Sequence, residues 1–118
     1  MKPALLVIDM QQIFFDTKAA AAASLDAAVE PINSAIELFR EKNLPILIIE
    51  DVKEAVGRVP GSPGFETTDR LHLEEHDPRI RKTYGNAFNH TGLDALLAKL
   101  GVDTLILTGF AASRCVLS

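Results

Sequence analysis

Three short runs dominated by apolar residues stand out along the chain, at residues 4–8, 46–49 and 104–108. Uninterrupted apolar runs of this length are typical of strands that are buried on both faces, as in a parallel sheet covered by helices. We therefore predict three buried strands. The charged segment 79–82 contains one isoleucine and predicts a fourth, shorter strand.

A helix is predicted between the first two strands. Apolar residues recur at helical spacing over residues 25–39, and either Ser24 or Asp26 is suited to cap its amino end. Pro31 interrupts this pattern, because proline has no backbone N–H and its ring collides with the preceding turn. We expect the helix to start late or to kink at this proline.

A second helix is predicted over residues 93–100. Thr91 is suited to cap its amino end, and Gly101 takes the position where helices commonly end in a left-handed residue. Between the two helices, residues 51–78 are rich in glycine and proline and show no sustained apolar period. We interpret them as a long surface excursion with a short helix near residues 68–73, a kind of loop that often serves in binding.

Strands that alternate with helices predict a three-layer α/β/α, Rossmann-like fold with a mostly parallel sheet, in a single domain over residues 1–118. Ligands of such sheets bind beyond the carboxyl ends of the strands. Asp9, Lys82 and the turn 109–115 all lie at the carboxyl ends of predicted strands. Glu50 and Asp51 do so too, and for them we expect an ordinary solvated strand end.

Composition narrows the classes of function. The 118 residues include 12 Lys+Arg and 16 Asp+Glu, with 47% hydrophobic residues, as in an ordinary globular chain. There is no basic run of the kind that nucleic acids or anionic membranes attract, and no apolar run approaches the length that spans a bilayer. We therefore expect a cytoplasmic protein with neither a nucleic-acid nor a membrane partner.

The single cysteine, Cys115, is either an inert buried thiol or a reactive one. A thiol becomes a useful nucleophile when a base takes its proton or a cation stabilises the thiolate, and Asp9 and Lys82 are suited to these roles. Small residues precede the cysteine, over 111–113, in a turn whose backbone N–H groups could face an oxyanion. The three side chains are compatible with acyl transfer to sulfur.

The sequence resembles the isochorismatase-like cysteine hydrolases, which include nicotinamidases and N-carbamoylsarcosine amidase. The matching segments, in order, are LLVIDMQ at 5–11 followed by Phe14, KTYGNAF at 82–88 followed by TGL at 91–93, and LILTGFA at 105–111 leading to Cys115. Each segment alone is weakly specific. Their order and spacing, and their positions at strand ends, agree over most of the chain outside the 51–78 excursion.

The resemblance implies a catalytic triad of Asp9, Lys82 and Cys115. Asp9 would take the thiol proton, the thiolate would attack an amide carbonyl, and the amine would leave with that proton before water releases the acid from the thioester. Lys82 would hold Asp9 and the thiolate in their charged forms. The implied substrate is a small amide, ureido or carbamoyl compound.

The resemblance also implies the surroundings of the triad. The backbone N–H groups of Ala111 and Cys115 would form an oxyanion hole, next to a cis peptide between Phe110 and Ala111. Phe14, Phe110 and Arg114 are the candidate substrate-binding residues. Members of the family commonly assemble as homo-oligomers that complete their pockets with neighbouring subunits, and we expect the same here.

One departure from the family concerns metal binding. Nicotinamidases hold a metal with an Asp-x-His element after the second strand, whereas here Asp51 is followed by Val52 and Lys53. His72 and His76 are four residues apart and would share one face of a helix, but they lie in acidic surface sequence. We expect no metal and no cofactor.

A second departure is the short sequence after the cysteine, where family members continue much further. We expect a fold truncated after the nucleophile turn, in a cleaved or incomplete chain or one that a partner chain completes. Two other functions stay open. One is hydrolysis of an enol ether, as in isochorismatase proper, without a covalent intermediate; the other is a non-catalytic binding protein on the same fold.

Overall fold

The structure, a computed structural model, describes residues 2–17, 19–83 and 92–109. The elements are β1 (Pro3–Ile8), α1 (Gln12–Thr17), α2 (Ala19–Glu41), β2 (Ile46–Asp51), the 3-10 helix η1 (Glu54–Val56), β3 (Arg79–Lys82), α3 (Leu93–Leu100) and β4 (Thr104–Gly109). No helix in these ranges is long and apolar enough to cross a membrane.

The four strands form one parallel sheet, as predicted, and their order in it is β3-β2-β1-β4. The chain moves from β1 outward through β2 to β3 and then returns to the other side of β1 to form β4. The point between β1 and β4 is therefore the place where the strand order reverses, and in open α/β sheets this is where ligands bind. Asp9 follows β1 directly and so lies at this point.

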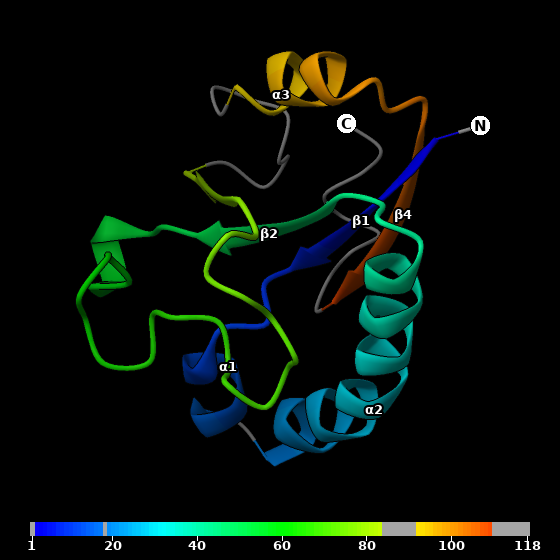
Figure 1. The fold of residues 1–118 in the computed structure, drawn as a ribbon. Helices are drawn as coiled ribbons and strands as arrows, with labels where there is room; N and C mark the ends of the chain where they lie inside the picture. The colour runs from blue at the N-terminus through cyan, green and yellow to red at the C-terminus, as the bar shows by residue number, and fades with distance from the viewer. Residues whose placement is uncertain (1, 18, 84–91, 110–118) are drawn as a thin grey trace.

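The sheet separates two apolar clusters, and alternate residues of β1 contribute to each. Leu5 and Val7 pack towards α2, whereas Leu6 and Ile8 pack towards α3. Figure 1 shows the two helices on opposite sides of the strands. This three-layer arrangement confirms the predicted fold class.

The helix α2 differs from its prediction at its start. It begins at Ala19, ahead of the two expected caps, because the alanine run that precedes them has high helix propensity and simply extends the helix. Pro31 lies inside the helix, and α2 changes direction in its middle (Figure 1). The predicted kink is therefore present, while the predicted late start is wrong.

The helix α3 matches its predicted range, from Leu93 to Leu100. Its N-cap is Gly92 in a left-handed conformation, one residue after the threonine that we expected in this role; Thr91 itself lies outside the described residues. Gly101 ends the helix as predicted: its φ is 71°, and its N–H donates to carbonyls of the last turn.

The segment 52–78 is more integrated into the core than a surface excursion. Phe65 is fully buried, and Leu71 belongs to the apolar cluster under α2. The loop also supplies backbone acceptors to the start of α1, since Ile13 donates to the carbonyl of Gly64. The predicted short helix at 68–73 is absent, and η1 is instead the helical turn of this segment.

The strand β4 is less buried than its apolar sequence predicts. Ile106 is 44% exposed and its neighbours along the strand are half-buried. The physical reason is position, because β4 stands at one end of the strand order and β1 is its partner within the described sheet. Leu105 and Leu107 still pack against the cluster under α3.

Candidate active site

Asp9 follows β1 in a backbone conformation that few residues adopt. Its φ is +57°, in the left-handed region that aspartate and asparagine tolerate better than most residues. Its N–H donates to the carbonyl of Ile49, and the residue is 7% exposed. The sharp turn after β1 therefore holds a buried carboxylate at the end of the sheet.

Lys82 is the last residue of β3 and points to the same place. Its Nζ lies 3.2 Å from Oδ1 and 3.3 Å from Oδ2 of Asp9, although 73 residues separate the two in sequence. Both side chains are buried. The structure thus brings together two of the three residues of the expected triad.

A second carboxylate shares this lysine. Asp51, at the end of β2, places its Oδ1 3.3 Å from Nζ of Lys82. Its Oδ2 accepts a hydrogen bond of 2.6 Å from Arg58, which lies after η1. The cluster of Asp9, Asp51, Lys82 and Arg58, hereafter the charge cluster, contains two acidic and two basic side chains.

The expectation of a solvated strand end at residues 50 and 51 is wrong. Glu50 is fully buried and accepts hydrogen bonds from the N–H and the hydroxyl of Thr67. The Asp51 backbone is bound from both sides by the amide of Gln11, which donates to its carbonyl at 3.0 Å and accepts from its N–H at 2.7 Å. The loop after β2 contacts both residues, which leaves Glu50 fully buried and Asp51 half-buried.

The pKa of Asp9 is raised from its ordinary value of 3.8 to about 6. Burial is the largest cause, since it disfavours the charged form, and the nearby Asp51 carboxylate adds to it. Lys82 and Arg58 act in the opposite direction. Oδ1 of Asp9 is buried and lies 3.2 Å from the Lys82 ammonium, but it accepts no hydrogen bond of good geometry from the described residues.

Phe14, expected to line the substrate pocket, is a half-buried residue of α1. The guanidinium of Arg58 stacks over its ring, 4.7 Å from the centroid. Beside Arg58 lies a cavity of about 290 Å³, lined by residues of α1 and of the loop that follows β2. Arg58 therefore connects the expected pocket wall to the charge cluster.

The remaining predicted site residues lie outside the described residues: Phe110, Ala111, Arg114 and Cys115, together with the expected cis peptide. The strand that leads to them is described. Gly109, the last residue of β4, is paired in register with Ile8, which directly precedes Asp9. The segment that carries the cysteine thus begins beside the aspartate.

Comparison with known proteins places this arrangement in a family. The family model of the isochorismatase domain matches residues 3–118. The chain belongs to the isochorismatase family.

Several members of the isochorismatase family resemble the chain over nearly its whole length. Streptothricin hydrolase of Streptomyces noursei is 36% identical over 120 residues, which cover 96% of this chain and 41% of that protein. A probable inactive nicotinamidase of Arabidopsis thaliana is 28% identical over 133 residues, covering 96% of this chain and 68% of the relative. These two relatives are thus a protein named as a hydrolase and a protein named as a probable inactive enzyme.

Among solved structures, N-carbamoylsarcosine amidase from Thermoplasma acidophilum is 30% identical and superposes with a TM-score of 0.80. The match covers 92% of this chain and 68% of that structure. The chain spans less than the full length of its curated relatives, for example 62% of an uncharacterized isochorismatase family protein of Bacillus subtilis.

The charge cluster does not suit the metal that nicotinamidases of the isochorismatase family hold after the second strand. Both oxygens of Asp51 are bound by protein cations, and no group of three or more metal-ligating side chains occurs in the described part of the chain. His72 lies in an irregular segment and His76 in a turn, rather than on one helix face, and Glu37 and Glu74 contact their rings.

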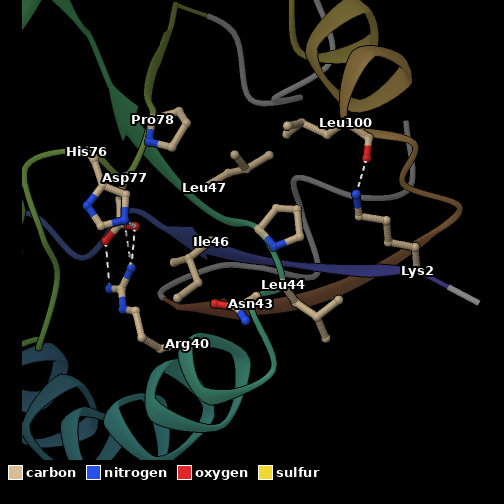
Figure 2. A pocket seen from close by; sticks show the side chains of 11 residues that line it. Lys2, Arg40, Asn43, Leu44, Ile46, Leu47, His76, Asp77, Pro78 and Leu100 are labelled. Atoms are coloured by element: carbon tan, nitrogen blue, oxygen red, sulfur yellow. Dashed lines mark hydrogen bonds and ion pairs between the residues drawn. The ribbon is translucent and has the colours of Figure 1, made fainter.

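A larger cavity of about 420 Å³ lies at the opposite edge of the sheet, where the strands begin. Figure 2 shows that its charged groups bind partners within the cavity wall. Arg40 forms two hydrogen bonds to Asp77, at 2.6 and 2.8 Å, and Lys2 donates to the carbonyl of Leu100. The pair of Arg40 and Asp77 connects α2 to the segment before β3. The hydrogen bond of Lys2 connects the residue before β1 to the end of α3.

Sequence reasoning missed Gln11, Arg58 and the role of Asp51. Gln11 lies two residues after Asp9, inside the segment that resembles the isochorismatase family, and this position could have indicated that it belongs to the site. No sequence feature indicated Arg58, because its contact with Asp51 depends on how the loop after β2 folds back.

Proposed function

We propose that the chain carries the catalytic residues of a cysteine hydrolase that acts on a small amide, ureido or carbamoyl compound. The observation that supports this most is the buried pair of Asp9 and Lys82 at the point where the strand order reverses. Relatives named as an amidase and as streptothricin hydrolase fit this class of reaction.

In this proposal Asp9 is the general base. A carboxyl whose pKa is about 6 is mostly ionised at neutral pH and still accepts a proton readily, which suits a base that works near pH 7. Its Oδ1, which accepts no hydrogen bond from the described residues, would receive the proton of the Cys115 thiol. The ammonium of Lys82 would stabilise both the carboxylate and the thiolate that forms.

The reaction then proceeds in two stages. The thiolate of Cys115 attacks the carbonyl carbon, the C–N bond breaks, and the amine leaves with the proton held by Asp9. Water, deprotonated by the same carboxylate, next attacks the thioester and releases the acid and the thiol. The N–H groups of Ala111 and Cys115 are proposed to stabilise the oxyanion in both stages, with Phe14, Phe110 and Arg114 around the substrate.

The test is alkylation of Cys115 by iodoacetamide at pH 6.5, followed by intact mass. An ordinary thiol with a pKa near 8.5 is about 1% thiolate at this pH. We expect rapid addition of a single label to the unmodified chain, and labelling at least about tenfold slower in Asp9→Asn and Lys82→Met. Asp94→Asn and Lys99→Met, on the exposed face of α3, are the matched controls and should label normally.

A panel of small amides, ureido acids and carbamoyl compounds, assayed by ammonia release, then tests turnover. We expect Cys115→Ala to abolish any turnover while the far-UV circular dichroism is unchanged. Labelling no faster than that of free glutathione would contradict the proposal and favour a binding protein. Hydrolysis of an enol ether that survives in Cys115→Ala would favour the non-covalent reaction.

A further inference from the structure

The ammonium of Lys82 is shared almost equally between two carboxylates. It lies 3.2 Å from Asp9 and 3.3 Å from Asp51, and both partners are largely shielded from water. One positive charge cannot balance two negative charges in such a place. Arg58 supplies the second positive charge through its 2.6 Å hydrogen bond to Asp51, so that the charge cluster is neutral as a whole.

Arg58 is fixed in this position from several sides. Its guanidinium stacks on Phe14, and its backbone exchanges hydrogen bonds with Lys53 across the turn that contains η1. Asp51 is equally fixed, because the amide of Gln11 binds its backbone on both sides. The pair therefore acts as a rigid support rather than as a mobile surface ion pair.

No other charged side chain of the described elements competes for this place. Glu50 and Arg81, the neighbours of Asp51 and Lys82 along their strands, point to the other face of the sheet, where Glu50 binds Thr67 and lies 3.7 Å from Arg81. Within the described residues, the charged groups around Asp9 are therefore Lys82, Asp51 and Arg58, and its ionisation responds to all three.

We propose that Arg58 and Asp51 are positioning residues that control the ionisation of Asp9 through Lys82. With Arg58 in place, the charge of Asp51 is balanced and Lys82 remains available to Asp9. Without Arg58, Asp51 would draw Lys82 towards itself and leave Asp9 less well compensated. The consequence for Cys115 rests on the proposed function; the effect on Asp9 does not.

Replacing the two positioning residues should shift the midpoint of Asp9 titration in opposite directions. A merely structural role would not produce shifts of opposite sign. Arg58→Gln leaves Asp51 unbalanced, so the midpoint of Asp9 titration should rise by about one pH unit. Asp51→Asn removes the competing carboxylate and should lower the midpoint by a similar amount. The double variant loses both charges and should return close to the original value, as should Arg58→Lys.

The experiment is a titration of the Asp9 carboxyl by ¹³C NMR in the folded chain and in these four variants, with folding checked by circular dichroism. Identical midpoints in Arg58→Gln and the unmodified chain, or shifts of the same sign in Arg58→Gln and Asp51→Asn, would overturn the proposal. If Arg58→Gln does not fold, Asp51→Asn is the remaining test. A lower Asp9 midpoint in this variant would support the proposal, and an unchanged midpoint would overturn it.

The rate of Cys115 alkylation, measured from pH 5 to 9 in the same variants, separates this inference from the proposed function. If both hold, the alkylation profile of Arg58→Gln moves to higher pH together with the Asp9 midpoint. An Asp9 midpoint that shifts as expected while alkylation stays constant would support the positioning role and contradict the role of Asp9 as the base for the thiol.

Discussion

Gly109 approaches Ile8 so closely that no larger residue fits between the two strands. A Cβ at Gly109 would lie 2.0 Å from the carbonyl oxygen of Ile8, and the φ of Gly109 is +115°. This contact joins the end of β4 to the residue before Asp9, and so it sets where the segment towards Cys115 begins.

We predict that Gly109→Ala lowers the free energy of unfolding by at least about 2 kcal/mol, because it adds steric overlap to an unfavourable φ. Gly57→Ala is the control: its φ is +73°, but a Cβ there meets nothing within 4 Å, so its cost should be about 1 kcal/mol. Urea denaturation measures both. Equal losses in the two variants would show that the approach to Ile8 is not responsible.

Asp9 should make stability fall as the pH rises. Its pKa in the folded chain, about 6, lies above the ordinary 3.8, so the folded state binds the proton more tightly than the unfolded state. The resulting stabilisation is complete below about pH 4 and is lost as the pH passes through about 6. Thermal denaturation of the unmodified chain and of Asp9→Asn between pH 4 and 7 tests this, since asparagine tolerates the same φ. If stability declines equally steeply with pH in both proteins, a group other than Asp9 causes the decline.

The bidentate pair of Arg40 and Asp77 should stabilise the end of the sheet where the strands begin. Burial alone raises the pKa of Asp77, but hydrogen bonds from Arg40 and from the N–H of Glu74 outweigh it and lower the pKa below 3.8. Asp77→Asn should therefore cost about 1–3 kcal/mol at pH 7, and the difference from the unmodified chain should shrink as the pH falls below about 4.

The control for this pair is Asp26→Asn, which breaks the more exposed ion pair with Arg70. Exposed pairs contribute less than about 1 kcal/mol, so this variant should unfold near the original denaturant midpoint. A cost as large as that of Asp77→Asn would mean that burial does not distinguish the two pairs.

Gln11 should contribute more to the free energy of unfolding than an uncharged side chain at the site would suggest. Gln11→Leu leaves the partly buried N–H and carbonyl of Asp51 without their side-chain partner, which should cost about 2 kcal/mol. Gln12→Leu, at the start of α1, is the control and removes a contact with the exposed Asp16. Chemical denaturation of the two variants side by side checks the difference, and similar midpoints would argue against a supporting role for Gln11.

The sequence predicted the parallel sheet from its apolar runs, and it placed Asp9 and Lys82 at the same end of that sheet because each lies at the carboxyl end of a predicted strand. Parallel strands end at one edge, so residues that follow them converge whatever the rest of the chain does. The start of α2 was misplaced because alanine extends a helix without contributing to an amphipathic pattern.

The burial of Glu50 and Asp51 could not be predicted in the same way. It depends on the loop after β2, whose path is fixed by individual contacts such as that of Arg58 with Phe14 rather than by a repeating pattern. Phe65 illustrates the point, since it is fully buried within a segment whose glycines and prolines suggest a solvent-exposed loop.

The strand β3 has only four residues and stands at one end of the strand order. It carries Lys82, on which both carboxylates of the charge cluster depend. Short terminal strands open at a lower free energy than the centre of a sheet. Hydrogen exchange should therefore find β3 opening while β1 remains protected, and each such opening would dismantle the site in a molecule that is otherwise folded.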